Sequence, residues 1–296
     1  MTNINKSEEK GSINNSKEKH ANLKVFLIGG TKDSINIIKF LKENYNSPYI
    51  LTTTTTDYGG KLALQAGSDE VINKPLPKSE ILNLLKNHFH KDNFDVLIDA
   101  THPFAVNITS TAIEVSKLAN IPYIRFERPK LDYSEFINDK TNNIFFVDSF
   151  KEAGDIIATK FSKKRVLHLA GVNTIELVLS SSKSSKIDKK NFFIRVLPVK
   201  SSIEKCNNLG ISGEHIIAMQ GVFSKEFNME LMRELDIQVI ITKESGAIGG
   251  VPSKIAAANE LGIDIILVNR PKIDNLDENT AVNDLLQLKK RLDFFL

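Results

Sequence analysis

The fold is decided by residues 24–31, which read KVFLIGGT. Four apolar residues are followed at once by two glycines, and over residues 33–45 the apolar side chains recur at helical spacing. A strand, a tight turn and a helix in this order begin a doubly wound α/β sheet, and the N-terminus of such a helix suits a phosphate. We therefore expect Gly29, Gly30 and Thr31 to contact a phosphorylated cofactor. A purely structural turn is the alternative, because the full G-x-G-x-x-G pattern is absent.

Strands and helices alternate along the rest of the chain, which predicts mostly parallel sheets with helices on both faces. A polar stretch around Pro129 separates two such runs. We expect a Rossmann-like domain over 23–128, a linker over 129–143, a second α/β domain over 144–296, and one cleft between the domains. The strands are expected at 25–28, 49–53, 70–72, 96–99, 123–125, 144–147, 166–169, 193–196, 216–219, 239–242 and 265–268. The helices are expected at 33–45, from 79 onward, and at 105–119, 225–234, 253–261 and 281–293.

The composition is that of a globular protein and excludes several classes of function. Of the 296 residues, 41% are hydrophobic, and 39 basic against 36 acidic residues leave a net charge of only +3, which gives no nucleic-acid footprint. The single cysteine, Cys206, excludes an intramolecular disulfide and a Cys-rich zinc site, and we expect no metal site. The chain shows no apolar run of membrane-spanning length and no signal peptide. We expect a cytoplasmic protein, not bound to a membrane, with a disordered polar tail over residues 1–22.

The second predicted strand ends in a run of threonines at residues 52–56. In NAD-binding domains an acidic residue at this place holds the ribose 2′-hydroxyl. Hydroxyl side chains such as those of Thr53 and Thr54 instead accommodate a 2′-phosphate, and Lys61 is near enough in sequence to add charge. The run favours NADPH over NADH. The alternatives are that Asp57 serves as the acidic residue, or that the threonines are ordinary strand composition.

The fourth predicted strand is followed by the segment DATHPFA at residues 99–105. Because ligands of open α/β sheets bind at the carboxyl ends of the strands, we expect Asp99, Thr101 and His102 at the cofactor. His102 is also the candidate for a catalytic proton donor. The structural alternative is that these residues only cap the next helix, whose first turn accommodates Pro103.

Three predicted strand ends in the second half carry unusual residues as well. They read AGVN at 170–173, QGVFS at 220–224 and KESG at 243–246. Basic residues gather near the same strand ends, and a cleft lined in this way favours a polyanionic ligand. The expected substrate-binding residues are Arg195, Gly221, Ser224, Lys243, Ser245, Gly246 and Lys254, with Lys200, Arg125 and Arg270 as further basic residues nearby. Tight glycine turns and merely solvated lysines are the structural alternative.

Together these motifs resemble the precorrin-6A and cobalt-precorrin-6A reductases of corrin biosynthesis, over about residues 24–271. The similarity rests on the glycine turn, on DATHPFA and on FIRVLP at 193–198, in the order of the family. It extends to TTTDYG at 54–59, which implies Tyr58 and Gly59 as further cofactor contacts.

The resemblance implies an NADPH-dependent reductase that delivers a hydride to the macrocycle of precorrin-6A and yields precorrin-6B. The tetrapyrrole carries many carboxylates, in agreement with a basic cleft. His102 and a bound water are both candidates to deliver the proton, and the presence of cobalt in the substrate and contacts with neighbouring enzymes of the pathway stay open. The chain departs from the family pattern at Val222, at Glu244 and in residues 73–76. Two alternatives are a non-catalytic NADP(H)-sensing protein and a two-domain tetrapyrrole enzyme without redox chemistry.

Overall fold

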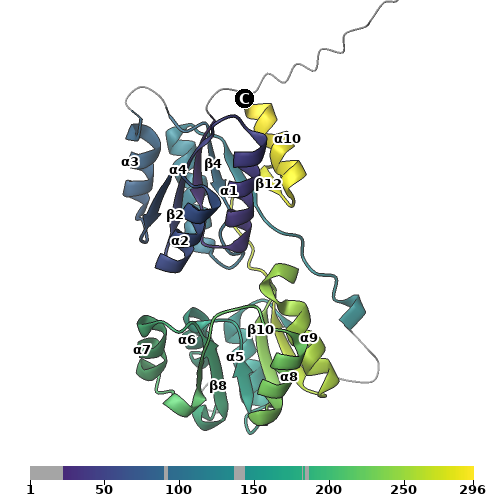
Figure 1. Ribbon diagram of the computed structural model, residues 1–296. Coiled ribbons are helices and arrows are strands. Elements are labelled where there is room, and N and C mark those ends of the chain that lie inside the picture. Colours follow the sequence, from purple (N-terminus) through teal and green to yellow (C-terminus); the bar gives the residue numbers. More distant parts are fainter. Residues whose placement is uncertain (1–22, 90–92, 137–143, 182, 184–186) are drawn as a thin grey trace, which may run out of the picture.

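The computed structural model describes residues 23–89, 93–136, 144–181, 183 and 187–296. They form two α/β units, each built on a sheet of six parallel strands (Figure 1). This confirms the predicted fold class of two Rossmann-like sheets. The predicted tail at 1–22 and residues 137–143 of the predicted linker lie outside the described residues.

The first sheet has the strand order β3-β2-β1-β4-β5-β12, with every neighbouring pair parallel. Its strands are β1 (Lys24–Ile28), β2 (Tyr49–Thr54), β3 (Glu70–Asn73), β4 (Val96–Asp99), β5 (Tyr123–Phe126) and β12 (Ala281–Val282). The helices around it are α1 (Lys32–Asn44), α2 (Asp57–Ala66), α3 (Lys78–Asn87), α4 (Val106–Ala119) and α10 (Leu285–Phe295).

The second sheet has the order β9-β8-β7-β10-β11-β6, again parallel throughout. Its strands are β6 (Ile144–Val147), β7 (Val166–His168), β8 (Phe192–Val196), β9 (Ile216–Ala218), β10 (Val239–Lys243) and β11 (Asp264–Val268). The helices around it are α5 (Phe150–Lys160), α6 (Ile175–Leu179), α7 (Lys200–Asn208), α8 (Lys225–Glu234) and α9 (Val251–Glu260). The sequence analysis did not predict α2, α5, α6 or α7.

Both faces of each sheet are covered by helices, which explains why the central strands are continuously apolar. Along β1, Val25 and Leu27 pack with residues of α1 and α10, while Phe26 and Ile28 pack on the opposite face with residues of α3 and α4. The second sheet repeats this arrangement, with α5, α6 and α7 on one face and α8 and α9 on the other.

The chain ends in the first unit, and the predicted extent of the second domain, 144–296, is therefore wrong for its last residues. Ala281 and Val282 pair with β5, and Leu288 and Leu292 of α10 pack in the core of the first unit. Figure 1 shows this helix, in yellow, beside α1. The predicted helix at 281–293 is a two-residue strand followed by α10, and a strand of that length leaves no readable periodicity in the sequence.

The strand order reverses at one place in each sheet, between β1 and β4 and between β7 and β10. Open α/β sheets bind ligands at the carboxyl ends of the strands beside such a reversal. The residues that follow these four strands are therefore the candidates for ligand binding. No helix in the described part of the chain is long and apolar enough to cross a bilayer.

Candidate active site: two grooves that meet at His102

A first groove of about 410 Å³ lies at the strand reversal of the first sheet. It brings together most of the predicted cofactor-binding residues, namely Gly29, Gly30, Thr31, Thr53, Thr54, Thr101 and His102. Gly30 has φ +95°, and a Cβ built on it would meet no atom within 4 Å. The backbone at this turn is thus open to a ligand that approaches closely.

The N-terminus of α1 forms one end of this groove and is arranged for an anion. The hydroxyl of Thr31 accepts a hydrogen bond from the Ser34 amide (3.2 Å) and donates one to the Ala100 carbonyl (2.7 Å). The cap satisfies the Ser34 amide, and the other amides of the first helical turn have no intrahelical partners. Asp33 in that turn is buried and forms an ion pair with Arg128, so its negative charge is compensated. The residues present fit a pyrophosphate.

The carboxyl ends of β2 and β3 form the other end of the groove. Thr53 and Thr54 line it together with Lys74, which the sequence analysis did not propose as a contact. Lys61, on α2, is exposed and does not line it. Asp57 lies outside as well, and its carboxylate accepts a hydrogen bond from the Asn73 amide group. These positions support a 2′-phosphate over a ribose held by a carboxylate.

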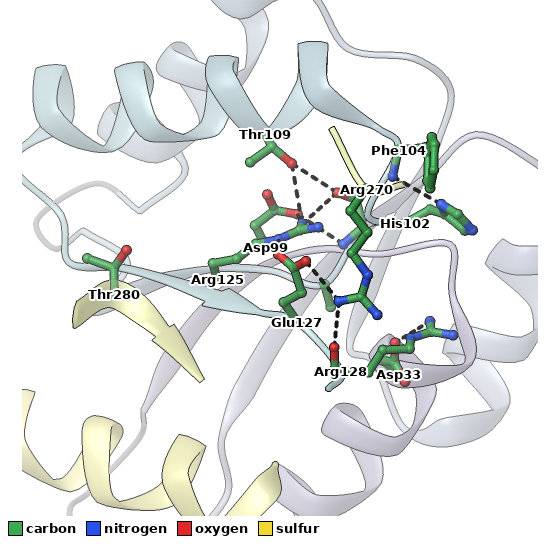
Figure 2. Close-up of polar contacts among 12 residues, drawn as sticks. Asp33, Asp99, His102, Phe104, Thr109, Arg125, Glu127, Arg128, Arg270 and Thr280 are labelled. Atoms are coloured by element: carbon green, nitrogen blue, oxygen red, sulfur yellow. Dashed lines mark hydrogen bonds and ion pairs between the residues drawn. The ribbon is translucent and has the colours of Figure 1, made fainter. Parts of the chain in front are cut away.

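Asp99 does not line the groove, although the sequence predicts it as a cofactor contact. It is fully buried and pairs with Arg125, also fully buried, at 2.7 Å (Figure 2). Asp99 Oδ1 also accepts a hydrogen bond from the Thr101 amide (2.9 Å), and Arg125 donates one to the Thr101 hydroxyl (2.9 Å). The buried pair therefore fixes the turn that carries Thr101 and His102. The sequence showed a charged residue at a strand end but not the charge that neutralises it.

His102 lies where the first groove meets a second one. Its Nδ1 accepts a hydrogen bond from the Phe104 amide (3.2 Å), so the proton of a neutral ring is on Nε2. Burial, followed by the positive charges of Lys243 and Arg128, lowers the pKa of His102 to about 2. The ring is neutral at physiological pH, which argues against its predicted role as a proton donor and leaves its predicted role as a ligand contact.

The second groove, of about 510 Å³, lies at the reversal of the second sheet, with His102, Phe104 and Ala105 of the first unit on its wall. The predicted residues Arg195, Gly221, Lys243 and Lys254 line it, and no acidic residue of the described chain does. Burial and the charges of Arg195 and Lys243 lower the pKa of Lys254 to about 7; burial alone lowers those of Lys243 to about 8 and of Arg195 to about 10. The groove thus collects cations that no carboxylate on its wall compensates.

Other predicted residues lie beside the two grooves without lining them. Tyr58 and Gly59 are in the first turn of α2, with the Tyr58 ring 57% exposed, and Ser224 caps α8 by accepting from the Phe227 amide (3.2 Å). Ser245 is buried, and a Cβ on Gly246 would lie 2.7 Å from Cδ of Arg128. The lysine expected nearby, Lys200, is exposed and pairs with Glu204.

Ion pairs at the connections between the units were not predicted from the sequence. Arg128 donates to the Ser245 carbonyl (3.1 Å) as well as pairing with Asp33, so it bridges the two sheets. Arg270 pairs with Glu127 at 2.9 Å (Figure 2) and with Glu244, and it does not line the basic groove. The sequence signal for both is an arginine directly after a strand-end segment, but that position alone does not distinguish a ligand contact from an ion pair.

The chain is similar to known proteins over most of its length. Residues 24–292 match the protein family described as precorrin-6x reductase CbiJ/CobK. A cobalt-precorrin-6A reductase of Methanocaldococcus jannaschii is 42% identical over 252 residues, which are 85% of this chain and 92% of that protein. One of Methanothermobacter thermautotrophicus is 39% identical over 270 residues, which are 89% and 82%. A solved structure described as CobK precorrin-6A reductase has the same fold, with a TM-score of 0.68 at 18% identity over 92% of this chain and 97% of that one.

Proposed function

Because this chain belongs to the CbiJ/CobK family of precorrin-6x reductases, we propose that it is a cytoplasmic enzyme that reduces the macrocycle of cobalt-precorrin-6A with NADPH. The observation that carries the proposal is the meeting of the two grooves at His102 and Ala105. A ligand in the first groove and a ligand in the second would be in contact there. Transfer of a hydride between two bound molecules requires such contact.

The first groove suits NADPH for reasons that lie in this chain. The glycine turn and the first turn of α1 would hold the pyrophosphate, and Thr53, Thr54 and Lys74 would surround the 2′-phosphate. Thr101 and His102 would then stand at the nicotinamide end. When bound, NADPH supplies the hydride; the protein binds and orients both reactants.

The second groove suits a flat tetrapyrrole with several carboxylates. Arg195, Lys243 and Lys254 would bind the carboxylates, and the apolar side chains at the carboxyl ends of β7, β8 and β9 would cover the ring. Leu197 on the groove wall is exposed, as are Val199, Val222 and Ile248 in the segments that follow β8, β9 and β10. Exposed apolar residues beside a ligand groove indicate a surface that is covered when the ligand binds.

The choice of the cobalt form rests on the relatives, since two of the most similar carry that name. No residue of the second groove reads the metal, because a tetrapyrrole supplies the equatorial ligands of its own metal ion. The test is the loss of NADPH absorbance with the purified protein and cobalt-precorrin-6A, repeated with metal-free precorrin-6A. Turnover of the cobalt form at a higher kcat/KM supports the proposal, and preference for the metal-free form corrects the substrate.

Each of the two alternatives from the sequence would give a different result in the same experiment. A protein that only senses NADP(H) would bind NADPH but oxidise none of it with either substrate. A tetrapyrrole enzyme without redox chemistry would bind the macrocycle without binding NADPH. Fluorescence titration of NADPH alongside the turnover assay therefore separates all three.

A further inference from the structure

The proposed reduction, on which this inference rests, needs a proton as well as a hydride. Addition of a hydride to one end of a double bond leaves an electron pair on the other end, and a positioned acid that protonates it accelerates the step. The acid must stand where the two grooves meet, beside His102 and Ala105.

The two histidines near the junction are poor proton donors. His102 is neutral, its Nδ1 is occupied by the Phe104 amide, and loss of the Nε2 proton would leave an anion. His168 is fully buried, and its Nε2 is bound to the Thr174 hydroxyl (2.8 Å). Arg195 keeps its proton at any physiological pH, because a guanidinium is too weak an acid.

Lys243 is a suitable donor by position. It ends β10, and its Nζ lies 5.3 Å from the ring centroid of Phe104, whose centroid is in turn 5.8 Å from that of His102. No hydrogen bond or ion pair joins its ammonium group to any other residue in the described ranges. Among the charges near His102, that of Lys243 lowers the pKa of the imidazole most.

Lys254 lies further along the second groove. Its Nζ is 3.5 Å from the Gly249 carbonyl, and the charges that act on it are those of Arg195 and then Lys243. The charge of Lys254 is not among those that lower the pKa of His102. Of the two lysines of the groove, Lys243 is therefore the one that reaches the junction, through its contact with Phe104 beside His102.

We propose that Lys243 delivers the proton of the reduction. One N–H bond of its ammonium group breaks, and the electron pair of that bond stays on Nζ. The proton forms a new bond with the substrate atom adjacent to the carbon that receives the hydride. The two electrons of the reduction come with the hydride, and solvent restores the ammonium group after product release.

The surroundings of Lys243 agree with this role. The titratable and charged groups that face it are His102, His168, Lys254 and Arg195, all neutral or positive. Burial lowers the pKa of Lys243 to about 8, so the group is mostly charged at pH 7 and still acidic enough to transfer its proton.

The test compares Lys243→Arg with Lys200→Arg, which both preserve the positive charge at the position they change; Lys200 is exposed and lines neither groove. Lys243→Arg removes the transferable proton, so kcat should fall about 100-fold or more while KM for the tetrapyrrole changes less than about threefold. It should also abolish the decline of kcat above about pH 8 that the wild type is expected to show. Lys200→Arg should keep both kcat and that decline. NADPH affinity, measured by fluorescence, should be unchanged in both variants.

A second readout does not depend on turnover. In the protein alone, the ¹³Cε signal of lysine that disappears in Lys243→Arg should titrate near pH 8. Titration near 10.5, or wild-type kcat in Lys243→Arg, overturns the role of Lys243 while leaving the reductase intact. A rise of KM with kcat unchanged would make Lys243 a carboxylate anchor only. A wild-type protein that binds NADPH and oxidises none with either substrate refutes the proposed function, and the role of Lys243 with it.

Discussion

The carboxyl edges of the two sheets differ in charge although their strand orders match. At the first edge, the groove is lined by glycine backbone and threonine hydroxyls, and the nearby charges of Asp99 and Arg125 neutralise each other below the surface. At the second edge, Arg195, Lys243 and Lys254 line the groove with no acidic residue of the described chain among its walls. One fold thus provides one edge suited to phosphates through amides, hydroxyls and Lys74, and another suited to carboxylates through uncompensated positive charge.

The largest effect should come from breaking the buried pair below the first edge. Asp99→Asn removes the nearer carboxylate of the fully buried Arg125 and leaves only Glu127, at 3.5 Å, which costs about 3–5 kcal/mol of stability. The matched control is Asp264→Asn in the second unit, whose pair with the half-exposed Lys164 is worth at most about 1 kcal/mol. Urea unfolding measures both. Equal losses would show that the first edge does not depend on its buried pair.

The next largest effect concerns NADPH affinity, which should depend on the first edge and not on the second. Gly30 and Gly171 have φ values of +95° and +93°, and a Cβ on either meets no atom within 4 Å. Asp at either position pays a similar backbone strain of about 1–2 kcal/mol, so the two variants control each other for folding. Gly30→Asp places a carboxylate at the pyrophosphate, and its NADPH Kd should rise about 100-fold, or about 2.7 kcal/mol.

Gly171→Asp should leave the NADPH Kd unchanged, because Gly171 lines the second groove and not the first. Its added carboxylate faces the cations there, and KM for the tetrapyrrole should rise. If both variants weakened NADPH equally, the assignment of one ligand to each edge would be wrong.

The sequence predicted which residues lie at the ends of the strands more reliably than the roles of those residues. The strand–turn–helix pattern of residues 24–45 and the apolar runs were sufficient for the two parallel sheets, because both depend on local periodicity. The return of β12 to the first sheet was not readable, since pairing with β5 across the whole second unit is a long-range contact. For the same reason the sequence grouped Arg125 and Arg270 with Lys243 as basic residues near strand ends. In the structure the two arginines form ion pairs with Asp99 and Glu244.

Lys254 offers a pH test of the charge at the second edge. Its pKa is about 7 in the folded protein and near 10.5 in the unfolded chain, so between these values the unfolded chain holds more protons. The free energy of unfolding should then rise with pH above 7, by at most about 1.4 kcal/mol per unit. Lys254→Met should show a smaller rise, because only the contribution of Lys243 remains, and Lys200→Met, which changes an exposed lysine, should keep the full rise. Parallel stability curves for Lys254→Met and the wild type would contradict the buried, uncompensated charge.

The smallest expected effect distinguishes two lysines at the first edge. Lys74 lines the groove beside Thr54, and its surface ion pair with Glu80 (2.8 Å) is exposed enough to exchange for a phosphate. Lys74→Ala should therefore raise the NADPH Kd about fivefold, or about 1 kcal/mol, and leave the NADH Kd unchanged. Lys61→Ala, which the sequence alone would have chosen, should change neither, because α2 holds Lys61 outside the groove. An equal loss of NADPH and NADH binding in Lys74→Ala would mean that Lys74 does not contact the 2′-phosphate. No charged side chain of the first groove would then contact the cofactor, and the threonines alone would select NADPH over NADH.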